Sequence, residues 1–388
     1  MRWLLAFALS AAACDPDRGS VRPDPPLPFA QELQDAVVDA LDDGRGSHQL
    51  GLSAAAFVPG FEIWSGVAGT SHPGVPVTPT TLFDVGSVAK SFEAALALAL
   101  ADEGVLGLDD PVSDWLPPLP RVDGAITVRQ LLNHTSGVFN VFENPAFPWV
   151  GADVDYTREW GLEEMFSTFV LEPYGRPGTV QHYSSTNYRL LTVILEEATG
   201  QSVPQGIRDR FLEPLGLHDA YMTMGDPPPE GFQVAHPMVD VDEDGTLDDI
   251  AGHSLRWIAS LTHPALFTTP TDLVRWISAL YYHRTVLPRH SLEAMLSYPH
   301  PEVLDPEGGR YGLGVVDFSE ILGANAFGHA GSALGYSAAA LYLPDLGVAM
   351  AWAINTGEGP PELAATLMGS VWRSMSAVVL RHLATESG

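Results

Sequence analysis

Strand-like segments occur only toward the two ends of this 388-residue chain, and their placement decides which folds are possible. Each is an apolar run bounded by turn residues, as is typical of buried strands. They are Leu50–Val58, Phe61–Val67, Gly312–Val316, Gly335–Leu343 and Val348–Ile354. The residues between, roughly 88–300, carry helical periodicity instead. The two ends must therefore pair into one mostly antiparallel sheet, with a helical and loop region inserted between them.

Helices are predicted beside this sheet at both ends of the folded region. In residues 29–43, Leu33, Val37 and Leu41 recur at four-residue spacing, so one helix face is apolar and the other acidic. Residues 361–382 again have a helical pattern. The predicted fold class is therefore α+β, an antiparallel sheet flanked by terminal helices with a large helical insertion. A cleft between the two lobes is the expected place for a site.

The N-terminal segment is typical of an export signal. Residues 1–13 combine a positive start with a short apolar run, and small residues precede the single cysteine, Cys14. This arrangement resembles the lipobox of bacterial lipoproteins, which are cleaved before a lipid-modified cysteine. We therefore expect an exported protein anchored through Cys14 to a membrane of the bacterial cell envelope, facing the periplasm or the outer surface. An ordinary signal peptide and a buried N-terminal helix are the alternatives.

Composition limits the remaining segments and the partners. Residues 14–28 are rich in proline and charge, so we predict an extended linker before a domain over residues 29–383. No later stretch is expected to be a membrane span. A single cysteine excludes an internal disulfide framework and cysteine-rich metal sites. Nucleic acid is not an expected partner, because 19 basic residues against 48 acidic ones leave a net charge of −29.

Lys90 is the only lysine of the chain, and it follows Ser87 by three residues. At the start of a predicted helix that runs to Glu103, this spacing places both side chains on the same face. The helix N-terminus offers backbone N–H groups for an oxyanion, and its positive end favours a neutral amine. Lysine, unlike arginine, can lose its proton in such a setting. The pair therefore predicts a nucleophile and its base; the structural alternative for Ser87 is a helix N-cap.

Five stretches of the chain follow the motif order of a known family. They are FDVGSVAKSF (83–92), ITVRQLLNHTSGV (126–138), HYSSTNYRLLTVILEEATG (182–200), YGLGV (311–315) and FGHAGSALGYSA (327–338). Through them, residues 29–383 resemble the serine hydrolases related to class C β-lactamases and D-alanyl-D-alanine carboxypeptidases, which include esterases. The resemblance implies a β-lactamase/DD-peptidase-like fold and hydrolysis through an acyl-enzyme, with no cofactor required.

The resemblance also implies roles in proton transfer. Ser87 takes the place of the nucleophile, Lys90 that of the general base and Tyr183 that of the catalytic tyrosine, which shares proton transfer to the leaving group. Taken alone, Tyr183 is more often a half-buried aromatic residue. His134, in the second stretch, is expected to be structural.

The third motif has the form His329-Ala330-Gly331. By resemblance, His329 polarises the proton-transfer network or contacts the substrate; its structural alternative is a strand histidine. The backbone N–H groups of Ser87 and Ser332, the latter directly after Gly331, would form the oxyanion hole.

Two departures from the family pattern bear on the substrate. Ser185 stands where many members have an asparagine that contacts a substrate amide, and the third motif lacks the lysine that grips a substrate carboxylate. With the acidic composition, both departures disfavour an anionic substrate and favour an ester or uncharged amide. A D-alanyl-D-alanine carboxypeptidase or β-lactamase, and a non-catalytic envelope binding protein with the same fold, are the alternatives.

Residues 240–249 resemble the opening of a calcium-binding loop. Asp240, Asp242 and Asp244 occupy alternate positions before Gly245, as in an EF-hand loop. Position twelve is Ala251 rather than glutamate, so Asp248 or Asp249 would have to complete the ligand shell. The sequence therefore admits a structural calcium ion, with a solvated acidic loop as the alternative.

Overall fold

A computed structural model gives the structure of this chain. It describes residues 23–44, 48–147, 155, 158–225, 230–242, 244–251, 260–300, 309–357 and 361–386. The predicted signal peptide at 1–13, Cys14 and residues 15–22 of the predicted linker lie outside the described residues.

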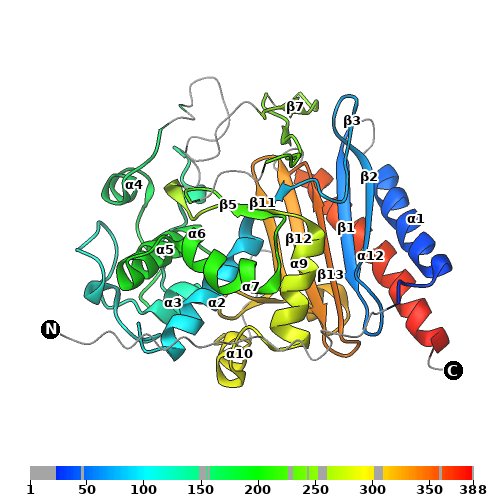
Figure 1. Ribbon diagram of the computed structural model, residues 1–388. Coiled ribbons are helices and arrows are strands. Elements are labelled where there is room, and N and C mark those ends of the chain that lie inside the picture. Colours follow the sequence, from blue (N-terminus) through cyan, green and yellow to red (C-terminus); the bar gives the residue numbers. More distant parts are fainter. Residues whose placement is uncertain are drawn as a thin grey trace.

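An eight-stranded antiparallel sheet joins the two ends of the folded region (Figure 1), in the order β3-β2-β1-β13-β12-β11-β10-β9. The strands are β1 (Gly51–Phe57), β2 (Trp64–His72), β3 (Val75–Pro76), β9 (Arg310–Tyr311), β10 (Val316–Asp317), β11 (Phe327–Ala333), β12 (Tyr336–Leu343) and β13 (Val348–Ile354). At its centre, β1 runs antiparallel to β13, with Leu52 opposite Ile354 and Phe57 opposite Ala349. The predicted sheet and fold class are confirmed.

The structure changes the predicted strands near the C-terminal end. Gly312–Val316 is largely a tight turn between β9 and β10, closed by a 2.8 Å hydrogen bond from the Gly312 N–H to the Val315 carbonyl. Gly314 has a φ of +71°, which glycine adopts without strain. The main strand of this region is β11. Its residues FGHAGSA are small and only partly apolar, so they do not form the apolar run by which the other strands were predicted.

Helices cover both faces of the sheet, so β1 and β13 are buried along their whole length. On one face, α1 (Leu27–Gly44) and α12 (Pro361–Glu386) lie side by side (Figure 1). Leu33, Val37 and Leu41 of α1 are buried there, as their spacing predicts. Each buried leucine or valine contributes roughly 1.5–3 kcal/mol.

By length and composition, α12 could cross a membrane, contrary to the expectation from the sequence. Its apolar stretch is Leu363–Thr385, in which an 18-residue window has a mean hydropathy of 1.4. Leu367, Val371 and Met375 on this helix are buried in the same core cluster as α1 and the sheet. Packing within the fold therefore accounts for these three side chains, while only 28% of the residues in that window are buried.

The other face of the sheet carries the helical region between β3 and β9. Its helices are α2 (Ala89–Asp102), α3 (Val128–Leu132), α4 (Leu162–Phe169), α5 (Ser185–Thr199), α6 (Val203–Ile207), α7 (Glu213–Leu215), α9 (Pro270–Ile277) and α10 (Arg289–Met295), and a short α11 (Ser319–Leu322) precedes β11. Single helical turns lie at Gly86–Val88, Val112–Asp114 and Val141–Glu143, and wider turns continue α6 and α9 over Arg208–Leu212 and Ser278–Tyr282. Thr127 caps α3 and Thr269 caps α9, each accepting a backbone N–H.

Two small sheets accompany these helices, although the sequence predicted only helices and loops here. One contains β4 (Phe83–Asp84), β8 (Leu266–Thr268) and β5 (Ala220–Met222), and the other pairs β6 (Met238–Val239) with β7 (Asp248–Asp249). Strands of two or three residues are too short to show alternation in a sequence. β4 leads directly into the turn that holds Ser87, so the first small sheet positions the predicted nucleophile.

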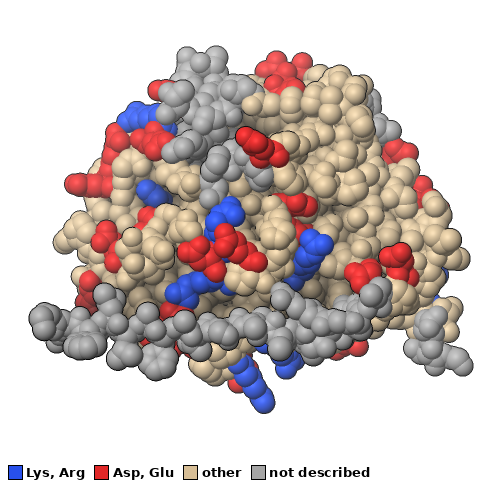
Figure 2. Space-filling view, viewed as in Figure 1, with Lys and Arg blue, Asp and Glu red and all other residues tan. Residues whose placement is uncertain are grey.

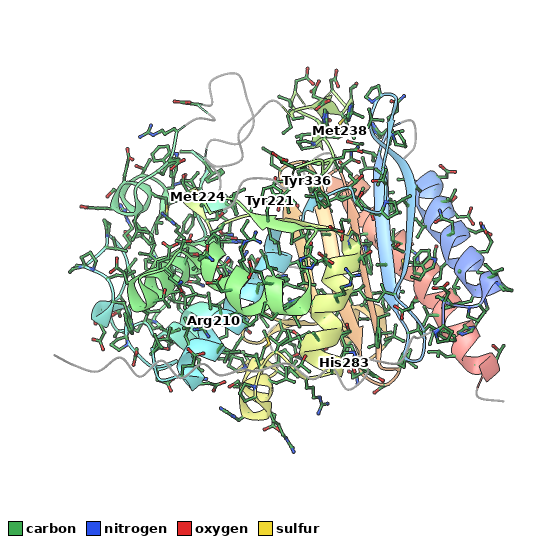
Figure 3. All side chains as sticks on the ribbon, in the orientation of Figure 1. Arg210, Tyr221, Met224, Met238, His283 and Tyr336 are labelled. Carbon is green, nitrogen blue, oxygen red and sulfur yellow. The ribbon has the colours of Figure 1, made fainter. Side chains whose placement is uncertain are left out.

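Aromatic packing connects this small sheet to the main one. Tyr221 of β5 stacks on Phe267 of β8, with ring centroids 5.0 Å apart, and Phe267 meets Tyr336 of β12 edge-on at 6.1 Å. Tyr221 and Tyr336 lie close to one another in Figure 3. The loop before α2 is therefore held against the main sheet by buried rings.

Candidate active site

Ser87 lies on the single helical turn Gly86–Val88, directly before α2. The turn is tight against β11: a Cβ at Gly86 would come within 2.6 Å of the Ser332 carbonyl oxygen, and Gly86 has a φ of +49°. The side chain of Asp84 stabilises the turn by accepting a 2.9 Å hydrogen bond from the Gly86 N–H. Only glycine at position 86 lets the nucleophile loop approach the strand this closely.

Lys90 follows one turn later and is completely buried. Its Nζ is 2.8 Å from Ser87 Oγ, within hydrogen-bonding distance. The three-residue spacing therefore brings the two side chains together as the sequence predicts.

Tyr183 reaches the same serine from the segment before α5. Its Oη donates a hydrogen bond to Ser87 Oγ at 2.7 Å, and Lys90 Nζ lies 5.2 Å from the centre of its ring. His134 packs against this ring at 4.4 Å and accepts a 3.2 Å hydrogen bond from the Ser184 N–H. Burial, followed by the Lys90 charge, lowers the pKa of His134, so its ring is neutral. His134 therefore supports the tyrosine from behind, in line with the structural role expected of it.

Gly331 brings β11 against the nucleophile turn. A Cβ at this position would lie 2.0 Å from the Val85 carbonyl oxygen and 2.8 Å from the Ser87 nitrogen. Ser332, the next residue, lines the same pocket as Ser87. The two N–H groups predicted for an oxyanion hole therefore belong to adjoining segments.

His329 lies on β11, the strand that also carries Gly331 and Ser332. It is buried but is not part of the lining described for the pocket; its Nε2 is 2.7 Å from Tyr311 Oη. Burial and the nearby Lys90 charge lower the pKa of His329 to about 3, so it is neutral. Tyr311 in turn meets the Tyr183 ring edge-on at 5.7 Å. His329 thus lies against Tyr311 and close enough to Lys90 to feel its charge, and both implied roles, polarising the proton-transfer network and contacting the substrate, stay predictions.

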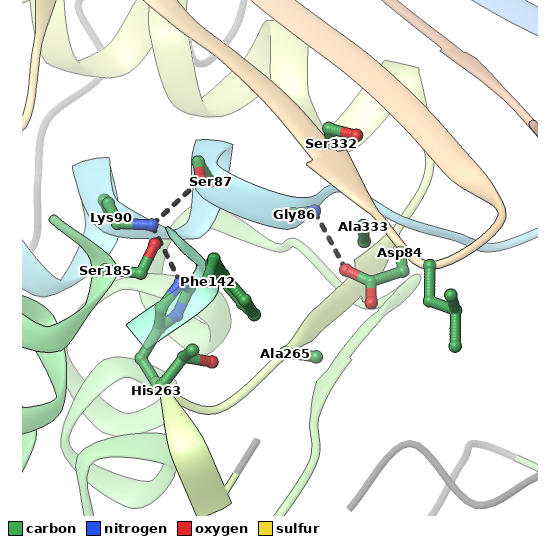
Figure 4. Close-up of a pocket in the computed structure, with 12 residues that line it drawn as sticks. Asp84, Gly86, Ser87, Lys90, Phe142, Ser185, His263, Ala265, Ser332 and Ala333 are labelled. Carbon is green, nitrogen blue, oxygen red and sulfur yellow. Dashed lines mark hydrogen bonds between the residues drawn. The ribbon is translucent and has the colours of Figure 1, made fainter. Parts of the chain in front are cut away.

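A small pocket of about 50 Å³ opens beside Ser87 (Figure 4). Its lining residues are Asp84, Gly86, Ser87, Lys90, Phe142, Ser185, Thr262, His263, Ala265, Ser332, Ala333 and Leu334. Ser185 is thus placed at the pocket as predicted, from the first turn of α5. Lys90 is the one lysine or arginine in this lining.

Three residues at or behind the pocket were not predicted from the sequence. His263 Nε2 is 3.0 Å from Lys90 Nζ, and Glu93 Oε1 is 3.0 Å from His263 Nδ1. Asp84 faces the pocket, where burial raises its pKa to about 7. His263 stands alone in a loop without a spacing motif, but Glu93 left a signal: it is the single charged residue among apolar ones after Lys90 in SFEAALALAL. A carboxylate on a buried helix face usually has a specific partner.

The acidic loop brings three of its predicted ligands together. Carboxylate oxygens of Asp240, Asp242 and Asp244 lie within 4.8 Å of one another. Asp240 accepts hydrogen bonds from the N–H groups of Asp244 and Gly245, at 3.1 and 2.9 Å. Asp248 is directed to the Val241 N–H at 3.4 Å instead. Calcium binding stays a prediction, with three candidate side chains placed together and Asp248 outside that group.

Calcium binding would raise the thermal stability of the protein. A folded state that binds the ion while the unfolded state does not is stabilised by an amount that grows with the logarithm of the ligand concentration above Kd, so millimolar calcium should raise the Tm in calorimetry. Asp242→Asn combined with Asp244→Asn should remove that increase, since both side chains are exposed and the fold does not depend on them. Equal Tm values in calcium and in chelator would assign the loop to the solvated alternative.

Acidic side chains are spread over the face of the molecule in Figure 2, with arginines beside several of them. Among the described residues, Arg129 pairs with Asp109 at 2.8 Å, and Arg210 pairs with Glu103. Such exposed pairs contribute little stability. In each pair the carboxylate neutralises the positive charge of the arginine. In this view the charge of these arginines is therefore offset by adjacent carboxylates.

The chain is similar in sequence to proteins of a known family. A sequence model of the Beta-lactamase family matches residues 34–370. Penicillin-binding protein 4 of Amycolatopsis lactamdurans is 35% identical over 233 residues, which cover 57% of this chain and 55% of that protein. Esterase EstB of Burkholderia gladioli is 32% identical over 174 residues, covering 42% and 43% of the two chains. The chain thus spans about half the length of these curated relatives.

A solved structure extends the likeness to the whole fold. The D-stereospecific amidohydrolase from a Streptomyces species is 28% identical, with a TM-score of 0.72, and the match covers 86% of this chain and 97% of that one. The family match includes every residue of the pocket, from Asp84 to Leu334. The extent of that match and the shared fold show that the chain belongs to the Beta-lactamase family of serine hydrolases.

Proposed function

We propose that this chain hydrolyses a small ester or uncharged amide through an acyl-enzyme on Ser87. One observation carries the proposal: Ser87 Oγ lies within hydrogen-bonding distance of both Lys90 Nζ, at 2.8 Å, and Tyr183 Oη, at 2.7 Å. A hydroxyl between an amine and a phenol has one group to accept its proton and a second to donate one. The N-cap alternative for Ser87 accounts for neither contact.

The proposed reaction has two halves. Lys90 Nζ accepts the Ser87 proton while Oγ attacks the substrate carbonyl, and the N–H groups of Ser87 and Ser332 bind the resulting oxyanion. Tyr183 Oη donates a proton to the leaving alcohol or amine, and the proton on Lys90 restores the phenol. Water then attacks the acyl carbon and gives one proton to Tyr183 or Lys90; the bond from the acyl carbon to Ser87 Oγ breaks, that proton is passed to Oγ, and the acid is released.

The charge of the pocket supports a neutral substrate. Asp84 contributes a carboxyl group to the lining, and the described lining contains no arginine. Because the pKa of Asp84 is raised to about 7, the group becomes anionic as the pH rises through that value. A substrate carboxylate would then meet a like charge, while an uncharged ester would not.

The substrate order on purified protein tests this proposal. A short-chain aryl ester should have a kcat/KM at least about tenfold above that of a penicillin or a D-alanyl-D-alanine peptide. Asp84→Asn, which can keep the hydrogen bond to Gly86, should narrow the gap above pH 7 by removing the like charge. A higher kcat/KM for the anionic substrates would favour the carboxypeptidase or β-lactamase alternative, for which the likeness to penicillin-binding protein 4 is the supporting observation.

A fluorophosphonate probe separates catalysis from simple binding. An active serine hydrolase is labelled covalently at its nucleophile, and mass spectrometry should find the adduct on the peptide that contains Ser87. A folded protein without any adduct would support the non-catalytic binding alternative.

We propose in addition that the protein is exported and anchored to the cell envelope through a lipid on Cys14, on the strength of residues 1–14 alone. Cys14→Ser should then move the protein from the membrane fraction to the soluble fraction. Retention of that variant in the membrane would contradict the lipid anchor.

A further inference from the structure

His263, in the lining of the pocket, and the buried Glu93 form a pair of side chains next to Lys90 that the proposed mechanism does not use. His263 Nε2 is 3.0 Å from Lys90 Nζ, and His263 Nδ1 is 3.0 Å from Glu93 Oε1. We propose that His263, oriented by Glu93, is a positioning residue that holds the Lys90 amine against Ser87 and fixes the direction of one of its N–H bonds. This inference rests on the proposed role of Lys90 as the base for Ser87.

The three residues come from two separate parts of the chain. Lys90 and Glu93 are one turn apart on α2, so both face the same side of that helix. His263 is 173 positions from Lys90, in the segment that leads into β8, and Figure 4 shows its ring directed at the amine. The second oxygen of Glu93 accepts a 3.0 Å hydrogen bond from Thr192 Oγ1 of α5. The carboxylate is therefore held between two helices, and it cannot move without breaking that contact.

The contacts of His263 determine its tautomer. Nδ1 faces two acceptors, the Glu93 carboxylate at 3.0 Å and the Pro264 carbonyl at 3.2 Å, so Nδ1 must carry the proton. Burial, followed by the Lys90 charge, lowers the pKa of His263, so the imidazole is neutral and Nε2 keeps its lone pair. Nε2 can then only accept a hydrogen bond, and Lys90 must donate it. With one N–H directed to His263, the amine is oriented with respect to Ser87 Oγ at 2.8 Å.

Other titratable groups surround this pair, and the variants proposed below leave them unchanged. Tyr188 of α5 lies over both, with its ring 6.3 Å from that of His263 and 5.4 Å from Lys90 Nζ. Tyr183 approaches Lys90 from the pocket side, and His329 of β11 interacts electrostatically with both Lys90 and His263. Among the described residues, Glu93 is the one carboxylate in direct contact with His263. A Glu93 substitution therefore changes the negative charge next to His263 and leaves the other surrounding groups in place.

Two His263 variants distinguish a positioning role from simple packing. His263→Leu fills the space but offers no acceptor, whereas the amide oxygen of His263→Gln can reach the position of Nε2 and accept from Lys90. For a short-chain aryl ester we expect kcat of the leucine variant to fall about 100-fold with KM changed less than about threefold. The glutamine variant should keep at least about a tenth of the parent kcat. Labelling of Ser87 by the fluorophosphonate probe should slow in the same order.

Glu93→Gln gives a second test that does not depend on His263 variants folding. Removing a negative charge near an amine makes the amine easier to deprotonate, so the acidic limb of the kcat/KM profile should move to lower pH. Ser91→Ala is the matched control, because Ser91 is a buried residue of the same helix as Glu93, and its loss removes the hydrogen bonds with Trp276 Nε1 of α9 and the Val88 carbonyl rather than a contact of Lys90 Nζ. This control should lower the Tm and leave the acidic limb in place.

Several outcomes would overturn the inference. A leucine variant within about threefold of the parent kcat would show that Lys90 needs no acceptor beside it. Leucine and glutamine variants that are equally slow, with the Tm of the parent, would show that hydrogen-bond acceptance is not what matters. An unmoved acidic limb in Glu93→Gln would also contradict it. In each of these outcomes the parent protein is active and is labelled at Ser87. A parent protein that is inactive and unlabelled would instead refute the proposed function, and the positioning role would fail with it.

Discussion

Arginine in place of Lys90 is expected to lower the turnover of an aryl ester at least about 1,000-fold, although the positive charge is kept. A guanidinium group stays protonated at any pH the protein tolerates, so it cannot accept the Ser87 proton. Because Lys90 is completely buried, arginine also has little room, and Lys90→Met serves as a second variant of similar length without charge. Both should be inactive, as measured by initial rates and by the loss of probe labelling.

The controls for this result use the neighbouring serine. Ser87→Ala should abolish the probe adduct and turnover while the Tm stays close to that of the parent, since only one hydroxyl is lost. Full labelling of that variant would place the nucleophile elsewhere. Near-normal turnover of Lys90→Arg would refute a mechanism in which the amine accepts a proton.

Alanine in place of Gly331 is expected to lower kcat about 100-fold and to destabilise the protein. The added Cβ would lie 2.0 Å from the Val85 carbonyl oxygen and 2.8 Å from the Ser87 nitrogen, and these are backbone atoms that cannot turn aside. β11 and the nucleophile turn must then separate, and the two N–H groups of the proposed oxyanion hole move apart. The measurement is kcat together with a urea unfolding curve.

Gly161→Ala is the matched control for this substitution, because its Cβ would meet nothing within 4 Å. It should keep the activity of the parent. A Gly331→Ala protein with the kcat of the parent would show that the strand and the turn can separate without affecting the oxyanion, and would contradict the proposed hole.

The sequence predicted those parts of the fold that rest on local patterns. β1, β12 and β13 are largely apolar runs of seven or eight residues, each bounded by turn residues, so their pairing followed from their placement. β4, β5 and β8 consist of two or three residues each and exist only because they pair with one another. The sequence does not contain enough periodicity to predict them.

The same distinction applies to the site. Ser87 and Lys90 lie one helical turn apart, so a local rule predicts their contact. Tyr183 came from the family pattern, and the structure places its Oη against Ser87. His263 meets Lys90 across 173 positions, and no motif links them. The resemblance implies that His329 polarises the proton-transfer network or contacts the substrate, and its neighbour in the fold, Tyr311, is a contact that no local pattern predicts.

The pairing of β1 with β13 also has a consequence for how the protein is made. The side chain of Asn355, directly after β13, accepts a hydrogen bond from the Gly51 N–H, 304 positions earlier in the chain. At about 5–20 residues per second, a ribosome needs roughly 15–60 s to synthesise the chain between these two partners. Throughout that interval the edge of β1 that pairs with β13 has no partner strand. The central pair of the sheet forms only after most of the chain has been made, so we expect slow folding governed by a long-range contact and a need for protection of that edge until synthesis is nearly complete.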